Sequence, residues 1–207
     1  MDRLATGISV LDRHLDGGLP VGSVVVLTAD PASQSELFVN TFAAVRDCLY
    51  LTTVRSAAAV EDGFERSTTD VGETTVRSIG ADEGPADAVA ALSALPERST
   101  LVIDSLAPLE AGDPTAYRRF LESVRSRAIE TESIAVLHAL RRDAPPAERA
   151  VSKQIADVVF DLRTTTSGTE VINRLAVPKF RGGAALEETM KLKLSDTVDV
   201  DTSRDIA

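Results

Sequence analysis

The sequence has one cysteine, Cys48, and two histidines, His14 and His138. A single cysteine cannot form an internal disulfide or a cysteine-based zinc site. One histidine falls in a helix-like stretch and the other in a strand-like stretch, which disfavours a histidine-based metal site. Cys48 begins the apolar run CLYLTT, which predicts a buried thiol. We therefore expect no bound metal.

Positive charge is scarce. The formal net charge of the 207 residues is −10, and lysine occurs only at positions 153, 179, 191 and 193. This acid-rich, alanine-rich composition resembles that of proteins from salt-loving archaea, whose self-repelling surfaces are screened by salt. The arginines between 118 and 127 do not share one helical face and are interrupted by Glu122. Since phosphate contacts need clustered cations, nucleic acid is not an expected partner.

Long apolar segments are also missing. No stretch reaches the apolar length of a membrane span, and the start MDRLATGISVLDRHL lacks the apolar core of a signal peptide. We expect a cytoplasmic protein that has no membrane partner.

Short runs rich in Val, Ile and Leu alternate with stretches of helical period. Nearly continuous apolar runs indicate strands buried on both faces, and strand–helix alternation is typical of an α/β fold with a mostly parallel central sheet and helices on both faces. Helices are expected from capping signals: Ser33 with Glu36, Ser56, Pro85, and Asp113 before Pro114. The expected strands are 23–28, 48–53, 74–79, 100–104, 133–138 and 156–162, and the expected helices are 33–46, 56–67, 84–95 and 113–130.

The last part of the chain changes character. Residues 169–183 and 188–203 alternate apolar and polar residues, which predicts an antiparallel hairpin with Gly182 and Gly183 in its turn. We expect one domain over 1–207, with a core at about 6–165 and a C-terminal β extension at about 169–203. Residues 141–150 contain paired prolines and mixed charges, which favours a mobile loop.

The stretch VVVLTADPASQSELF (24–38) has the layout of a phosphate-binding P-loop, but it lacks the residues of that motif. In G-x-x-x-x-G-K-[ST], glycines let backbone N–H groups close around phosphates, lysine neutralises their charge, and Ser or Thr holds Mg²⁺. The aligned residues here are Ala29, Gln34, Ser35 and Glu36. The complete candidate loop is Ala29, Asp30, Pro31, Ala32, Ser33, Gln34, Ser35 and Glu36.

Electrostatics disfavours a triphosphate in this loop. The helix N-terminus offers an anion about 0.3–1 kcal/mol. A carboxylate at Glu36 repels the same anion by a similar or larger amount at equal distance. We therefore expect no cofactor, apart from weak ATP binding with Mg²⁺ if Glu36 ligates a bridging cation.

Residues 6–31, TGISVLDRHLDGGLPVGSVVVLTADP, resemble the entry segment of KaiC-like ATPases in the RecA superfamily, T-G-x-x-x-L-D-x-x-L-x-G-G-[LI]-P-x-G-[ST]. The run TLVIDSL (100–106) is similar to that family's Walker B strand, which implies that Asp104 lies on the Mg²⁺ side and is followed by Ser105. VPKFRGG (177–183) resembles the family's K-x-R-G segment. There Lys and Arg reach the nucleotide of a neighbouring subunit, which implies a trans-acting, subunit-interface role for Lys179 and Arg181.

This resemblance covers about residues 6 to 200 and implies a RecA-like P-loop NTPase fold with a C-terminal antiparallel β extension. LTADPASQSEL and DTSRDIA are similar to a haloarchaeal group of RecA-like proteins often called HTR-like. The departures are as informative as the matches. Val54 and Arg55 occupy the places of the family's catalytic glutamates, and His138 occupies that of a small polar sensor residue, where a satisfied strand-end histidine is the alternative.

Three functions remain open. The leading interpretation is a catalytically inactive RecA/KaiC-like domain, a pseudo-ATPase that acts as a regulatory or assembly partner in archaeal signalling or regulation. Its partner would be a second copy or an active RecA/KaiC-like ATPase. The second is a divergent ATP-binding protein or ATPase, in which Asp104 and Glu36 hold a cation and Ser33 or Ser35 contacts phosphate. The third is a DNA recombination or repair accessory of the RecA-paralogue type.

Overall fold

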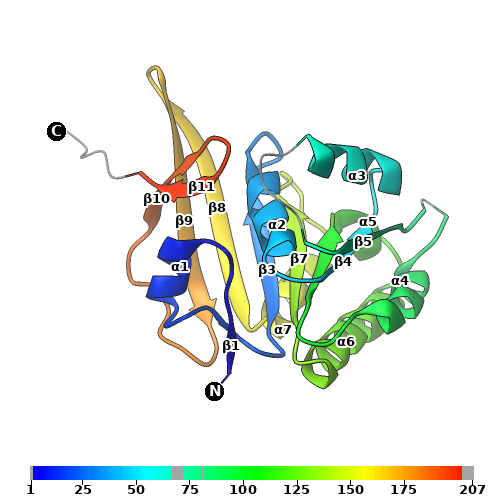
Figure 1. The fold of residues 1–207 in the computed structure, drawn as a ribbon. Helices are drawn as coiled ribbons and strands as arrows, with labels where there is room; N and C mark the ends of the chain where they lie inside the picture. Colours follow the sequence, from blue (N-terminus) through cyan, green and yellow to red (C-terminus); the bar gives the residue numbers. More distant parts are fainter. Residues whose placement is uncertain (1, 67–71, 81, 202–207) are drawn as a thin grey trace.

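A nine-stranded sheet runs through the molecule in the order β11-β10-β9-β8-β3-β7-β6-β4-β5 (Figure 1). The computed structural model describes residues 2–66, 72–80 and 82–201. Six neighbouring strands are parallel: β8 (Val158–Ser167), β3 (Val24–Ala29), β7 (Ile134–Leu140), β6 (Thr100–Asp104), β4 (Cys48–Thr52) and β5 (Thr74–Ser78). Three continue the sheet antiparallel: β9 (Glu170–Phe180), β10 (Met190–Leu194) and β11 (Val198–Val200). This is the predicted fold class.

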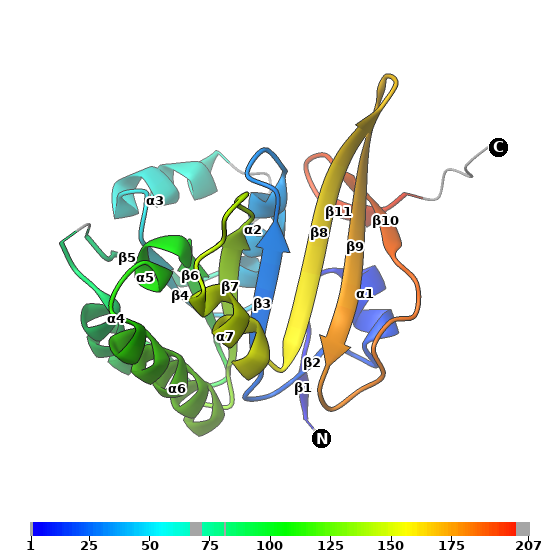
Figure 2. The same cartoon turned by 180° about the vertical axis from the view of Figure 1, so that it is seen from behind.

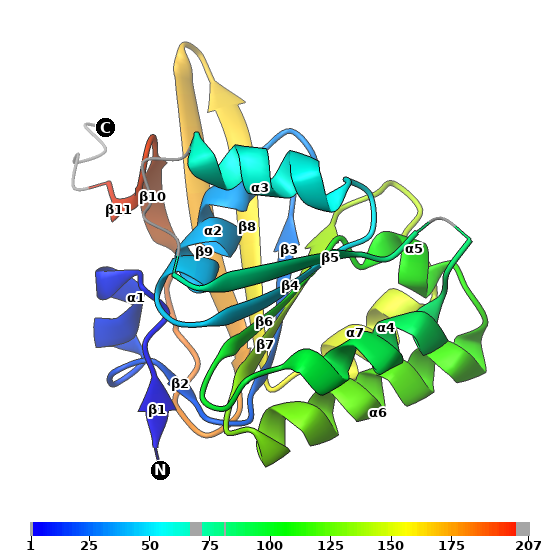
Figure 3. The same ribbon diagram turned by 45° about the vertical axis from the view of Figure 1, so that its right-hand side comes forward.

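Helices cover both faces of the sheet. On one face lie α1 (Ser9–His14), α2 (Ser35–Ala44) and α3 (Ala57–Glu65). On the other lie α4 (Pro85–Ala91), α5 (Ala107–Glu110), α6 (Pro114–Glu130) and α7 (Glu148–Ile155), which come forward in Figure 2. Figure 3 shows α3 and α6 on opposite sides of the strands. A two-stranded ribbon, β1 (Arg3–Leu4) with β2 (Leu19–Pro20), precedes β3.

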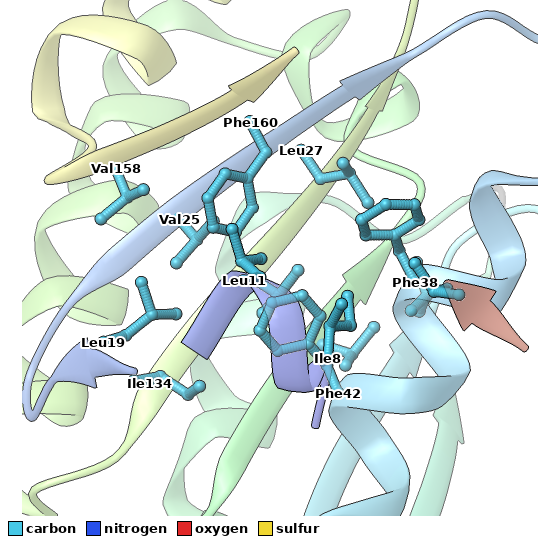
Figure 4. Packing of buried hydrophobic residues seen from close by; sticks show 14 of the residues in the cluster. Ile8, Leu11, Leu19, Val25, Leu27, Phe38, Phe42, Ile134, Val158 and Phe160 are labelled. Atoms are coloured by element: carbon cyan, nitrogen blue, oxygen red, sulfur yellow. The ribbon is translucent and has the colours of Figure 1, made fainter. Parts of the chain in front are cut away.

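The two apolar cores explain the strand sequences. Val25 and Leu27 of β3 pack with Phe38 and Phe42 of α2 and with Phe160 of β8 (Figure 4). The alternate strand residues face the other core, beneath α4 and α6. Because both faces are covered, these strands carry continuous apolar runs rather than alternating ones.

Most local signals in the sequence act as expected. Ser56 accepts a hydrogen bond from the backbone of Ala59, and Asp113 accepts one from Ala116, so both cap their helices. Cys48 is buried, and burial raises the pKa of its thiol. The tail strands β9 and β10 pair antiparallel, as predicted for 169–183 and 188–203.

Two local predictions are wrong. The capping box expected at Ser33 and Glu36 does not form, because the Ser33 hydroxyl donates to the carbonyl of Asp30 at 2.6 Å and closes a turn of the loop instead. Helix α2 therefore begins at Ser35, without a side-chain cap. The segment 141–150 is not a loop throughout, since α7 starts at Glu148.

Gly18 allows the N-terminal ribbon to form. Its φ is +121°, and a Cβ placed there would lie 2.2 Å from the carbonyl oxygen of Leu4. A side chain at this position would clash with the β1 backbone as well as adopt an unfavourable conformation.

Across residues 2–66, 72–80 and 82–201, none of the helices combines the length and the apolar character that crossing a membrane requires.

A buried ion pair fastens α7 to the body of the fold. Arg149 donates to both carboxylate oxygens of Glu110, at 2.6 and 2.7 Å, and to the carbonyl of Leu140 at 3.1 Å. The two side chains are only 7% and 0% exposed. Ser152 also donates to Glu110 at 3.2 Å. The pair therefore links the ends of β6 and β7 through the helices that follow them.

We predict that Arg149→Ala lowers the free energy of unfolding by about 3–5 kcal/mol, because Glu110 would remain buried without its partner. Urea unfolding measures the change. Arg98→Ala is the matched control: Arg98 pairs with Asp2 and Glu132 at an exposed site, and its loss should lower the stability much less. Equal effects of the two variants would contradict the assigned role of the buried pair.

Candidate functional site

The carboxyl ends of β3, β4, β6 and β7 bring the candidate residues together at one edge of the sheet. Strand register is the cause, because Asp104 pairs with Thr52 on one side and with His138 on the other. The loop after β3 and the loop after β4 begin at the same edge. Open parallel sheets bind ligands at this edge, so it is where a site is expected.

Asp104 is the centre of the site. Its Oδ1 lies 2.8 Å from Nδ1 of His138, while its Oδ2 accepts hydrogen bonds from the Tyr50 hydroxyl at 2.6 Å and from Arg55 at 2.8 Å. Burial alone would raise the pKa of this carboxyl, but the hydrogen bond and charge of His138, with Tyr50 and Arg55, outweigh it and hold the pKa well below its usual range. Asp104 is therefore an anion.

His138 connects Asp104 to the first residue of α2. Its Nε2 lies 3.1 Å from Oγ of Ser35, and both residues are only 2% exposed. The Asp104 carboxylate can only accept a hydrogen bond, so Nδ1 of His138 carries a proton. The sequence placed His138 at the end of its strand, whereas β7 continues to Leu140 and His138 faces the site from within it.

Arg55 closes the arrangement into a ring. One of its terminal nitrogens donates to Asp104, and the other lies 3.5 Å from a carboxylate oxygen of Glu36. Glu36 follows Ser35 in the chain, so the path runs from Ser35 through His138, Asp104, Arg55 and Glu36 back to Ser35. Burial would lower the pKa of Arg55, but the neighbouring Tyr50 and Asp104 raise it. We call these five residues the polar ring.

The tip of the loop after β3 is held by a second set of contacts. Asp30 accepts hydrogen bonds from Arg141 at 2.9 Å and from the backbone of Thr164 at 2.9 Å. Arg141 also contacts Asp161, so β7, β8 and the loop are tied together. Pro31 and Ala32 are exposed at the tip.

A cavity of about 400 Å³ lies beside this loop. Ala32, Ser33 and Gln34 line it from the loop, and Asn173 and Leu192 line it from the antiparallel part of the sheet. The sequence did not indicate this cavity, because it depends on how the tail strands pack beside the loop.

Ser105 and Val54, which lie next to members of the polar ring in the sequence, do not belong to it. Ser105 donates its backbone N–H to the Thr53 hydroxyl at 3.0 Å, and that hydroxyl donates to the carbonyl of Ser105 at 2.6 Å. The peptide bond between Asp104 and Ser105 is cis. Val54 is 71% exposed and makes no part of the ring.

Lys179 and Arg181 lie elsewhere. Lys179 pairs with Val159 near the start of β8, which places it at the amino edge of the parallel sheet, opposite Asp104. It donates to the carbonyls of Lys153 and Gln154 at 2.8 and 2.9 Å, and Arg181 donates to that of Gln154 at 3.0 Å. Both cations therefore cap the C-terminus of α7, and burial together with the Arg181 charge lowers the pKa of Lys179.

Several arginines considered for DNA contact are also paired within the chain. Arg125 contacts Asp157 at 3.1 Å, and Arg127 donates to the carbonyl of Leu95 at 3.0 Å. Arg141, which lies outside the segment 118–127, is likewise held by Asp30 and Asp161. These contacts reduce the positive charge available to a phosphate backbone.

Sequence reasoning missed two members of the site. Tyr50 was assigned only to a strand, but strand alternation places it and Thr52 on the same face as Asp104, which could have indicated the contact. The resemblance places Arg55 where the family has a catalytic glutamate, with reversed charge, but it does not indicate that Arg55 contacts Asp104. Within the described residues, no group of three or more His, Cys, Asp or Glu side chains is arranged to hold a metal ion.

The fold is similar to that of a protein described as KaiC-like. The crystal structure of a KaiC-like protein from the hyperthermophilic archaeon Pyrococcus horikoshii OT3 matches it with a TM-score of 0.78 at 16% identity, covering 97% of this chain and 99% of that chain. The chain belongs to a family of unknown function, DUF7125, whose model matches residues 3–207. No curated protein matches it in sequence.

The polar ring predicts a specific acid sensitivity. The pKa of Asp104 is lowered in the folded state, so its stabilising contribution is complete above about pH 4 and is lost as pH falls below the unfolded value of 3.8. Between about pH 7 and about pH 3 this loss should reach about 1 kcal/mol. Urea unfolding at both pH values should show a smaller loss for Asp104→Asn than for the native chain. Tyr50→Phe keeps the carboxylate and should retain the loss; an Asp104→Asn variant as acid-sensitive as the native chain would contradict the assignment.

Proposed function

We propose that this protein is a RecA/KaiC-like domain that does not hydrolyse ATP and acts as a regulatory or assembly partner. The observation that carries the proposal is the polar ring. At the edge of the sheet where such a fold would hold a phosphate and a metal ion, Arg55 and His138 already bind Asp104, and Ser35 and Glu36 complete the circuit.

Charge supports this interpretation. Glu36 and Asp104 contribute two negative charges, and Arg55 contributes one positive charge that both of them share. A polyphosphate would add negative charge to a site without a lysine at position 35. Binding it would also require Arg55 to leave a buried carboxylate, which is unfavourable.

The biological setting belongs to the same proposal. The acidic composition supports a haloarchaeal, HTR-like protein of the cytoplasm, and the KaiC-like fold supports assembly with itself or with an active RecA/KaiC-like ATPase. The cavity beside Ser33 and Gln34 favours one alternative, nucleotide binding without turnover.

We predict that calorimetric titration with MgATP in molar salt gives no saturable binding to the native chain. Glu36→Thr removes the exposed carboxylate and should permit weak but saturable binding. Glu61→Thr, on the exposed face of α3, is the matched control and should behave as the native chain does. Micromolar binding to the native chain would overturn the proposal and favour the alternative.

The proposed role as a partner leads to a separate prediction. In this role, Lys179 and Arg181 contact the nucleotide that is bound by a neighbouring subunit. Affinity capture from native cells in molar salt should recover an intact RecA-like ATPase with the native chain and much less with Lys179→Ala/Arg181→Ala. Arg163→Ala removes a similarly exposed cation and should leave recovery unchanged. Recovery of the same ATPase by all three proteins would contradict this role.

A further inference from the structure

Three members of the polar ring have the relative geometry of a nucleophile, a base and an orienting acid. Oγ of Ser35 lies 3.1 Å from Nε2 of His138, and Nδ1 of the same ring lies 2.8 Å from Oδ1 of Asp104. Both distances fall within the range for an activated serine and its base. Such a triad is recognised by geometry and roles rather than by position in a particular fold.

The contacts are compatible with the proton positions that this chemistry needs. Asp104 accepts from Nδ1 of His138, so in the neutral imidazole it is Nε2, 3.1 Å from Oγ of Ser35, that carries the lone pair. The other oxygen of Asp104 is fixed by Tyr50 and Arg55. The acid that orients His138 is therefore itself held in one position.

The local chain path also suits a nucleophile. Ser35 is the first residue of α2, after a short turn from β3, which places its hydroxyl at a strand–turn–helix junction above a parallel sheet. First-turn N–H groups of a helix have no partner within that helix. The N–H of Glu36, which follows Ser35, is thus available to a developing oxyanion.

We propose that Ser35, His138 and Asp104 form a serine esterase site for small, uncharged carboxylic esters. Oγ of Ser35 attacks the carbonyl carbon while its proton passes to Nε2 of His138. The ester C–O bond then breaks, and His138 returns that proton to the departing alcohol. Water, deprotonated by His138, attacks the acyl-Ser35 ester and releases the carboxylic acid and the free serine. The carboxylates of Glu36 and Asp104 disfavour an anionic acyl group, which sets the substrate class.

A substrate must reach a hydroxyl that is buried in the structure. Ser35 is 2% exposed, whereas Arg55 comes from the connection between β4 and α3 and has a side chain 33% exposed. Arg55 is held toward α2 by Glu36, whose side chain is 60% exposed. The proposed chemistry requires Arg55 to move away from Glu36, so that a substrate can reach Ser35.

The experiment uses a fluorophosphonate probe with the full chain in molar salt. Attack by Oγ of Ser35 on phosphorus forms a Ser–O–P bond and expels fluoride, and the serine proton leaves through His138. Intact mass should show one adduct, and peptide mapping of the native chain should place it on Ser35. Ser35→Ala should abolish the adduct, whereas Ser126→Ala, which removes an exposed hydroxyl of α6 outside the site, should retain it.

Two further variants test the relay and the access route. His138→Gln should slow labelling, and also hydrolysis of p-nitrophenyl acetate, by about 100-fold or more, because the base is lost. Glu36→Gln removes the exposed ion pair that holds Arg55 near α2. Because an exposed ion pair is weak, labelling should accelerate by only about two- to fivefold. Circular dichroism establishes that each variant is folded.

Peptide mapping on the native chain keeps the proposal testable even where a variant does not fold. No adduct under denaturant-free conditions, or an adduct on another residue, overturns it. An adduct on Ser35 whose rate is unchanged in folded His138→Gln also overturns it, since the serine would then react without the relay.

Discussion

The carboxylate of Asp104 is the group on which the carboxyl edge of the sheet depends. It is almost fully buried, and an unpaired charge at such a position would be strongly destabilising. Three side chains from two neighbouring strands and one connection meet it: Tyr50, Arg55 and His138. Their positions are therefore linked to one another by the need to satisfy a single anion.

That requirement extends to the loop after β3. When Nδ1 of the buried His138 ring contacts Asp104, Nε2 also needs a hydrogen-bond partner, because an unpaired buried polar atom is unfavourable. The Ser35 hydroxyl is that partner. Ser35 begins α2, so the start of this helix is fixed by a contact from β7 rather than by a local cap. Asp30, held by Arg141 and Thr164, fixes the other end of the same loop. Contacts at both of its ends therefore fix the shape of the loop.

Much of the fold could be predicted from the sequence because its signals are local. Continuous apolar runs marked the parallel strands, and Asp113 with Pro114 marked the start of α6. The site could be predicted only in part. Its candidate positions came from a resemblance, but the contacts between them depend on register across three strands and on where one arginine points. The helix cap predicted at Ser33 does not form for a related reason. A serine hydroxyl can bond either to a turn or to the start of a helix, and the conformation of the surrounding loop determines which bond forms.

Each residue of the polar ring has a neighbouring member of the ring as a contact, so the role of each depends on the others. Ser35 offers its hydroxyl to one nitrogen of the His138 ring at the start of the helix, and Asp104 accepts from the other. Arg55 then balances Asp104 and Glu36, both of which would otherwise face each other as like charges across the edge of the sheet. A lysine at position 35 would remove the hydroxyl that faces Nε2 of His138. The five residues therefore satisfy one another, and the groups that they bring together are a hydroxyl, an imidazole and a carboxylate.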